Sequence, residues 1–123
     1  MIAGLGLDVC EIARMEQLLK NQRFLSRFFA PEERAYIENR GMGAAQSLAG
    51  MFAAKEALTK ALGVGLTAGE LTDIRVLHDP LGAPYFDLRG EFARLTAERG
   101  ITAWHLSIAH DGGVAAAVAI AER

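Results

Sequence analysis

The spacing of apolar positions changes along the first half of this chain, and each spacing predicts one element. Residues 2–9 form an apolar run with glycines, which is typical of a buried strand. Helical spacing follows over residues 12–19 and again over residues 24–29, with a polar break between them. A further helix is predicted to begin at Pro31, which two acids follow, and to end at the glycines of residues 41–43.

Residues 45–62 are predicted to form the longest helix, because alanine recurs there at every fourth position. Such a row makes one helix face shallow, so we expect the helix axis to approach a sheet or another helix closely. Gly63 follows as a natural helix stop. The four alanines are Ala49, Ala53, Ala57 and Ala61.

The second half of the chain combines strand and turn signals with one short helix. Strands are predicted over residues 73–77 and 84–87, and a helix over residues 91–99. Two more strands, over residues 103–109 and 114–121, flank an Asp-Gly-Gly sequence that signals a hairpin. Together the elements predict an α+β fold in which helices pack on one face of a mainly antiparallel sheet.

Composition narrows the class of protein. The 123 residues fit a single domain spanning residues 1–123, and 51% hydrophobic against 23% charged residues argues for a sizeable core. No apolar run is long enough to cross a membrane, and no basic segment precedes the first one as in a signal peptide. Cys10 is the only cysteine, so no internal disulfide is possible and we expect a cytoplasmic protein. The net charge of −2 argues against a broadly basic nucleic-acid binder.

Three charged side chains interrupt two otherwise apolar elements. Asp8 comes near the end of the first strand, while Glu56 and Lys60 lie four residues apart on one face of the alanine-rich helix. Two carboxylates suit Mg²⁺, which takes one or two protein carboxylates and completes its shell with water or substrate phosphate. Lys60 is placed to meet the same phosphate as a point charge. Spacing alone leaves a simpler interpretation open, in which Glu56 and Lys60 form a surface ion pair and Asp8 only ends a strand.

Two motifs resemble the signatures of the 4′-phosphopantetheinyl transferases. The first is the Gly-Leu-Gly-Leu-Asp sequence of residues 4–8 followed by Arg14, and the second spans residues 52–63. Residues 82–85 and 105–110 extend the resemblance over nearly the whole chain, and it is strongest to the small bacterial type, the holo-acyl-carrier-protein synthases. Because both motifs occur at this separation and chain length, the resemblance is specific.

The resemblance implies an activity and assigns roles to the three charged residues. Enzymes of this family transfer the 4′-phosphopantetheine group of coenzyme A to a serine of apo acyl carrier protein, releasing adenosine 3′,5′-bisphosphate, and so supply holo carrier for fatty acid biosynthesis. Asp8 and Glu56 match the family's Mg²⁺-binding acids, and Lys60 matches the base that contacts the phosphates. Either Glu56 or a metal-ordered water is able to accept the serine proton, and the sequence does not decide between them.

The resemblance also assigns coenzyme A-binding residues in the second half of the chain. These are Pro84 and Tyr85, together with His105 and Ser107, which we expect near the nucleotide end, in addition to Lys60. The sequence further predicts that His105, Ser107 and His110 face the same side of one strand. They make no convincing zinc set, so a polar strand face is the simpler interpretation.

Two positions depart from the family pattern. Met51 stands where the family commonly has a basic residue, which puts one phosphate contact in doubt. Ala109 stands where the family favours serine or threonine, which puts the role of that hydroxyl in doubt. Neither departure touches the proposed metal ligands.

A locally basic stretch lies between Arg14 and Arg27, where Lys20 and Arg23 add to the charge and Glu16 is the only acid. By resemblance it docks the acidic apo acyl carrier protein, with Arg14, Arg23 and Arg27 as the contacting residues, and complementary charge would steer the encounter. A solvated amphipathic helix face is the simpler interpretation. Nucleic acid is disfavoured as a partner by the acid-rich segment that follows.

Chain length bears on assembly. Larger transferases of this superfamily contain two related halves, whereas this chain has the length of one half and no internal repeat. We therefore expect a homo-oligomer, a trimer by resemblance, with active sites between subunits. Two other functions stay open: a different Mg²⁺-dependent phosphate enzyme using Asp8 and Glu56, or a non-catalytic module for carrier docking or oligomerisation.

Overall fold

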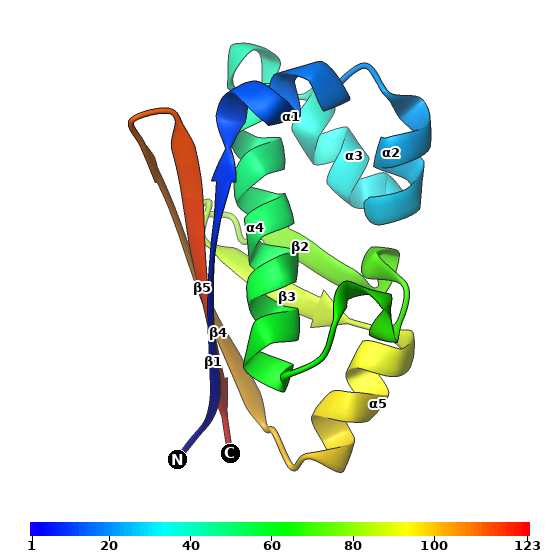
Figure 1. Ribbon diagram of the computed structural model, residues 1–123, viewed down its shortest axis with the longest axis vertical. Helices are drawn as coiled ribbons and strands as arrows, with labels where there is room; N and C mark the ends of the chain where they lie inside the picture. Colours follow the sequence, from blue (N-terminus) through cyan, green and yellow to red (C-terminus); the bar gives the residue numbers. More distant parts are fainter.

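A computed structural model describes all 123 residues and shows an antiparallel sheet with one helix lying along its inner face (Figure 1). Three strands form this sheet in the order β1 (Ile2–Glu11), β5 (Val114–Glu122) and β4 (Ala103–Asp111). The inner face packs against α4 (Ala44–Leu62). The prediction of an α+β fold, with helices on one face of an antiparallel sheet, is confirmed.

The strands of the chain's middle part do not join this sheet. They form a second, two-stranded sheet of β2 (Ile74–His78) and β3 (Pro84–Leu88), which packs against α4 and β4 and crosses behind α4 in Figure 1. Both sheets are antiparallel throughout.

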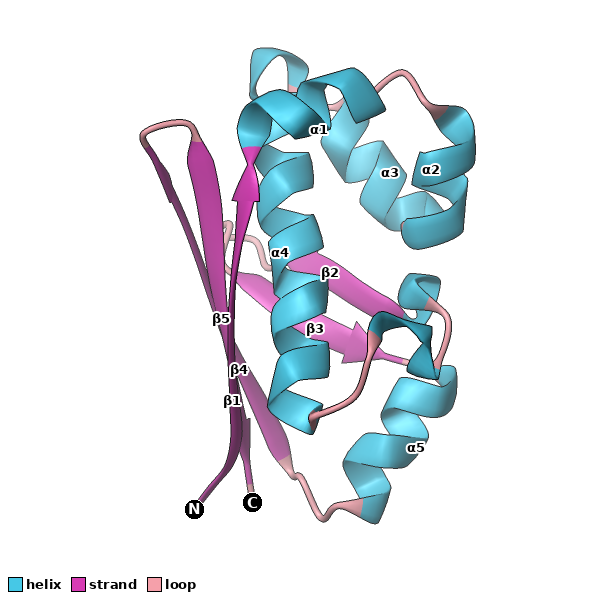
Figure 2. Cartoon of the chain, viewed as in Figure 1, coloured by secondary structure: helices cyan, strands magenta, loops and turns pink.

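Shorter helices gather at the two ends of α4 (Figure 2). The break predicted after the first helix is real, because Asn21 caps the second one by accepting a hydrogen bond from the Phe24 N–H at 3.1 Å. Pro31 opens the third helix, with two glutamates in its first turn, as predicted. None of the helices combines the length and apolar character needed to span a bilayer. The short helices are α1 (Ile12–Leu18), α2 (Gln22–Phe28), α3 (Pro31–Glu38) and α5 (Gly90–Glu98), with 3-10 turns η1 (Gly41–Gly43), η2 (Leu66–Ala68) and η3 (Leu71–Asp73).

Strand β1 lies against α4 with almost no side chain between them. A Cβ atom at Gly6 would overlap the carbonyl oxygen of Ala57, and one at Gly4 would overlap the carbonyl oxygen of Ala61. The expected close approach therefore occurs, with two glycines of the strand facing two alanines of the helix. As a result, the next inward residue of the strand, Asp8, is placed beside α4.

The two faces of the three-stranded sheet differ in what covers them. The inward positions of β5 are alanines that are fully buried under α4: Ala115, Ala117, Ala119 and Ala121. On the outer face, apolar side chains of β1 remain 57–66% exposed: Ile2, Leu5, Leu7 and Val9. Figure 1 shows no element over this outer face. An apolar surface of this kind on a strand-rich face is typical of an interaction site.

Candidate active site

The contact of β1 with α4 brings together Asp8, Glu56 and Lys60. The Lys60 ammonium donates to Asp8 Oδ1 at 2.9 Å and to the Leu7 carbonyl oxygen at 3.1 Å. The side chain of Lys60 is 56% exposed, while that of Asp8 is 10% exposed. Lys60 makes its ion pair with Asp8 across the two elements, and it makes none with Glu56. The simpler interpretation of a Glu–Lys pair along the helix surface is therefore wrong.

The surroundings of Glu56 raise the pKa of its carboxyl group. Burial raises its pKa to about 7, and the carboxyl of Asp8 beside it adds to the effect. The cations of Lys60 and Arg14 act in the opposite direction and offset only part of it. Because Asp8 opposes the ionisation of Glu56, a cation bound beside both carboxyl groups would be stabilised there.

One oxygen of the site has no partner. Asp8 Oδ2 is buried and makes no hydrogen bond, although Oδ1 of the same carboxylate is bound to Lys60. A buried carboxylate oxygen without a donor is costly, and either the proton that the raised pKa keeps on Glu56 or a bound cation would supply the missing partner. No group of three or more histidine, cysteine or acidic side chains is placed to hold a metal. Two carboxylates, Asp8 and Glu56, fit a hard cation such as Mg²⁺, whose shell is largely completed by water and phosphate.

A cavity of about 310 Å³ lies between α1, α2 and α3, away from these acids. A hollow of about 230 Å³ lies between α4, β4 and the β2–β3 turn. The latter is lined by Arg40, Ser47, Met51 and His110. Cationic and hydroxyl side chains together make this hollow suitable for an anionic ligand.

The aromatic wall of this hollow is held by stacking. The rings of Tyr36 and His78 lie parallel with centroids 3.9 Å apart, and the Arg40 guanidinium lies 5.4 Å from the Tyr36 ring centroid. Burial lowers the pKa of His78, and the charge of Arg40 lowers it further. A neutral imidazole and an aromatic ring thus form a flat surface beside a fixed cation.

The predicted coenzyme-binding residues are divided between two faces of the molecule. Pro84 lines the hollow, and Tyr85, which is 46% exposed, lines a neighbouring depression. His105 and Ser107 lie on the exposed outer face of the sheet, where His105 Nε2 is 2.9 Å from Glu122 Oε1. The prediction that His110 shares their face is wrong, since it lies an odd number of residues away and lines the hollow on the inner side.

The hollow contains residues that the sequence did not reveal. The side of His110 follows from counting along the strand, so that signal was present. Arg40 gave no signal, because it precedes a glycine-rich turn and reaches the hollow only through the path of the chain around η1.

The basic stretch is exposed on α1 and α2. Arg14 belongs to α1, and its charge acts on the carboxyl of Glu56, so it lies near the acidic pair. Arg23 and Arg27 belong to α2, where Arg27 lies 5.4 Å above the ring of Phe28. Beneath them the aromatic rings pack against each other, with centroids 5.0 to 6.2 Å apart: Phe24, Phe28, Phe29 and Phe52. Packed aromatic rings therefore support the helix that carries Arg23 and Arg27.

Comparisons with known proteins agree with this arrangement. A model of the 4′-phosphopantetheinyl transferase superfamily matches residues 4–119. The chain is 47% identical to a holo-[acyl-carrier-protein] synthase of Treponema denticola over 122 residues, which cover 99% of each chain.

Two solved structures are similar in fold as well. One is a holo-[acyl-carrier-protein] synthase of Helicobacter pylori in complex with coenzyme A, with a TM-score of 0.82, 34% identity, and coverage of 96% of this chain and 99% of that one. The other is a holo-[acyl-carrier-protein] synthase of Neisseria meningitidis, with a TM-score of 0.89, 34% identity and complete coverage of both chains.

Proposed function

This chain belongs to the holo-[acyl-carrier-protein] synthases of the 4′-phosphopantetheinyl transferase superfamily, and on that premise we propose how its own residues carry out the transfer. The reaction moves the 4′-phosphopantetheine group from coenzyme A to a serine of apo acyl carrier protein. The serine oxygen bonds to the phosphorus, the bond from that phosphorus to the bridging oxygen breaks, and adenosine 3′,5′-bisphosphate leaves.

The observation that carries the proposal is the cluster of Asp8, Glu56 and Lys60. Asp8 and Glu56 are the residues that would hold Mg²⁺, and the buried, unpartnered Asp8 Oδ2 supports this assignment. When bound there, the metal supplies charge neutralisation to the pyrophosphate and its leaving oxygen. Lys60, more than half exposed, adds a positive charge beside the same position.

The serine proton requires an acceptor. The carboxylate of Glu56 is one candidate, because it lies beside Asp8 at the reaction centre. A water ordered at the metal site is the other candidate.

The nucleotide end of coenzyme A is proposed to use the hollow that contains Arg40 and His110. Pro84 forms one wall, and the stacked rings of Tyr36 and His78 lie beside it. Arg40 is proposed to supply a phosphate contact that a basic residue at the position of Met51 would otherwise make.

Carrier docking is assigned to the exposed arginines of α1 and α2. Replacing Arg14 with glutamate reverses a charge close to Glu56, so we expect kcat/KM for the carrier to fall by about tenfold or more at low salt. Arg89→Glu, on the far side of the molecule, is the matched control. Equal kinetics of the two variants would remove Arg14 from the docking surface.

A homotrimer with active sites between subunits is proposed from the uncovered outer face of the sheet. A second copy placed there would bury Leu5 and Leu7, and it would bring His105 and Ser107 next to another subunit. Leu5→Glu combined with Leu7→Glu is expected to give monomers by light scattering. A fully active wild-type monomer would contradict this assembly.

The transfer itself is tested by intact-mass spectrometry of an apo acyl carrier protein incubated with the enzyme, coenzyme A and Mg²⁺. The expected result is a gain of one phosphopantetheine group, which disappears in EDTA and returns with added Mg²⁺. No gain with several carriers would favour a different Mg²⁺-dependent phosphate reaction, and a gain that persists in EDTA would remove the metal from the reaction.

A further inference from the structure

A second lysine–carboxylate pair lies on α4 one residue before Glu56, and it is closed to solvent. The Lys55 ammonium donates to Glu33 Oε1 at 2.7 Å, to the Phe28 carbonyl oxygen at 2.7 Å and to the Leu71 carbonyl oxygen at 2.9 Å. Both side chains are completely buried. The ring of Phe29 lies 4.6 Å from the ammonium, so all three N–H groups and one further side of the cation have partners.

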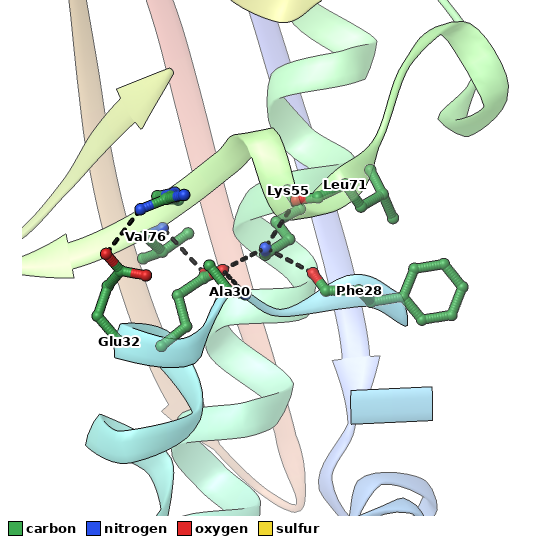
Figure 3. Close-up of polar contacts among 8 residues, drawn as sticks. Phe28, Ala30, Glu32, Lys55, Leu71 and Val76 are labelled. Atoms are coloured by element: carbon green, nitrogen blue, oxygen red, sulfur yellow. Dashed lines mark hydrogen bonds and ion pairs between the residues drawn. The ribbon is translucent and has the colours of Figure 1, made fainter. Parts of the chain in front are cut away.

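The carboxylate of this pair is equally well satisfied. Glu33 Oε1 also accepts from the Ala30 N–H at 2.9 Å, and Oε2 accepts from the Val76 N–H at 3.0 Å. Figure 3 shows Lys55 bonded to the carbonyls of Phe28 and Leu71, with Ala30 and Val76 on the side of the carboxylate. Every polar atom of the network therefore has a partner, the condition under which a buried polar network becomes rigid.

The pair joins segments that are distant in the sequence. It ties α4 to the end of α2, the start of α3, η3 and the β2 strand. A purely stabilising role explains it poorly, because apolar side chains of similar volume at such positions are often at least as stable as a buried ion pair.

The position of the pair links the docking surface to the reaction centre. Arg27 precedes Phe28, whose carbonyl accepts from Lys55, and Lys55 precedes Glu56. The hydrogen bond from Lys55 to the Phe28 carbonyl therefore connects the residue after Arg27 with the residue before Glu56. Consecutive helix residues point about 100° apart, so Lys55 faces α2 while Glu56 faces β1.

We propose that Lys55 and Glu33 are positioning residues that set α2 relative to α4 and thereby place the serine of the docked carrier against the phosphate to be transferred. The inference rests on the proposed function. A small error in such a placement has a large kinetic cost, since misplacement of reacting groups by about 1 Å reduces rates by about 100-fold.

The same pair also fixes the walls of a groove beside the docking helix. Phe28 and Leu71 lie on this groove together with Arg27 and Leu66, and both give their carbonyls to Lys55. Loosening Lys55 would therefore release Arg27 and the facing η2–η3 segment together.

Glu33→Gln is the first test, because it removes the charge and keeps one of the two acceptor oxygens, so that one of the two backbone amides, of Ala30 or Val76, keeps its partner. We expect kcat/KM for the carrier to fall about tenfold, with the Kd of coenzyme A and Mg²⁺ changed by less than about twofold. Glu32→Gln is the matched control: it is the neighbouring residue, and its pair with Arg75 at 2.6 Å joins the same α3 and β2 without touching Lys55. All variants are compared well below their melting temperatures.

A double-mutant cycle with Arg27→Ala separates positioning from general weakening of the structure. If Glu33 acts through the placement of α2, its substitution costs much less once Arg27 is gone, so the two losses are not additive. Additive losses, or an Arg27→Ala variant as active as wild type, would overturn the proposal.

A second variant covers the case in which Glu33→Gln does not fold. Lys55→Met with Glu33→Gln removes both charges together and retains an acceptor for one of the two backbone amides. It enters the same cycle with the same expectation. If neither variant folds, the pair acts in folding alone and the positioning role is withdrawn. A wild-type enzyme that transfers nothing refutes the proposed function itself, which distinguishes that failure from the failure of this inference.

Discussion

The two lysine–carboxylate pairs of α4 use the same chemical groups in opposite ways. Lys55 and Glu33 are fully buried, and every donor and acceptor between them has a partner. Lys60 and Asp8 are joined by a bond of similar length, 2.9 Å, but Lys60 is largely exposed and one Asp8 oxygen has no partner. The first pair is complete without any ligand, whereas the second pair is complete only when something else binds.

The hydrogen bonds that each pair makes indicate whether it holds the fold together or belongs to the reaction site. Lys55 is held by three acceptors from separate segments, so it fixes these segments relative to one another and has no donor left for a ligand. Beside Lys60, by contrast, the carboxyl of Glu56 has a pKa of about 7 because it is partly buried next to Asp8. A strongly raised pKa and a buried oxygen without a hydrogen bond are found in folded proteins mainly where a ligand later supplies the missing partner.

The largest expected effect comes from removing the incomplete carboxylate. Asp8→Asn takes away a metal ligand and half of the negative charge of the site, so we expect turnover to fall by about 10³-fold or more. The melting temperature should change little, because the same substitution relieves repulsion with Glu56. Turnover is followed by carrier mass, and folding by calorimetry. Retained turnover would remove Asp8 from the metal site and make the two pairs alike.

The next effect compares the two lysines by stability. Lys55→Met leaves Glu33 buried without its cation, and breaking a buried pair in this way costs about 3–5 kcal/mol of unfolding free energy. Lys60→Met removes a largely exposed ammonium but leaves Asp8 without its cation, so it should cost less unfolding free energy than Lys55→Met while activity is lost. Urea unfolding of both variants measures the contrast. Equal destabilisation would contradict the division into a closed and an open pair.

The smallest effect concerns pH. The pKa of Glu56 is raised from 4.5 to about 7 in the metal-free protein, so protons compete with Mg²⁺ below neutral pH. We expect the Kd of Mg²⁺ to be about tenfold higher at pH 6 than at pH 8, as measured by calorimetry. An affinity that does not depend on pH would show that the raised pKa has no part in metal binding.

The same shift sets the sign of a stability change. Between pH 4.5 and about 7 the folded metal-free protein retains a proton on Glu56 that the unfolded chain has released. Its stability should therefore fall as pH rises through this window, and saturating Mg²⁺ should reduce that fall. Melting curves with Mg²⁺ and with EDTA test both directions, and curves that coincide across this range would count against the site.

Much of the fold could be predicted from the sequence because its signals are local. The long helix was expected over residues 45–62 and spans Ala44–Leu62, since alanine spacing and Gly63 define it without reference to the rest of the chain. The separation of β2 and β3 into a sheet of their own could not be predicted, because strand order depends on packing between distant segments.

Part of the candidate site could also be predicted from the sequence. Asp8, Glu56 and Lys60 stood out as charges within apolar elements, and the structure brings them together. Lys55 stood in the same helix, yet its partner Glu33 lies 22 residues away on a different element, and no local pattern links them. Pairing of that kind is a property of the folded chain and not of any segment.

The seam where Gly4 and Gly6 meet Ala57 and Ala61 has a practical consequence for engineering. Because backbone touches backbone there, the distance between the strand that carries Asp8 and the helix that carries Glu56 is set by atoms that no rotamer change can move. A mutagenesis library aimed at higher heat resistance can therefore vary the core under α5 and β3 while the spacing of the two acids stays constant. Positions 4 and 6 belong outside such a library, since any side chain there would separate the two acids.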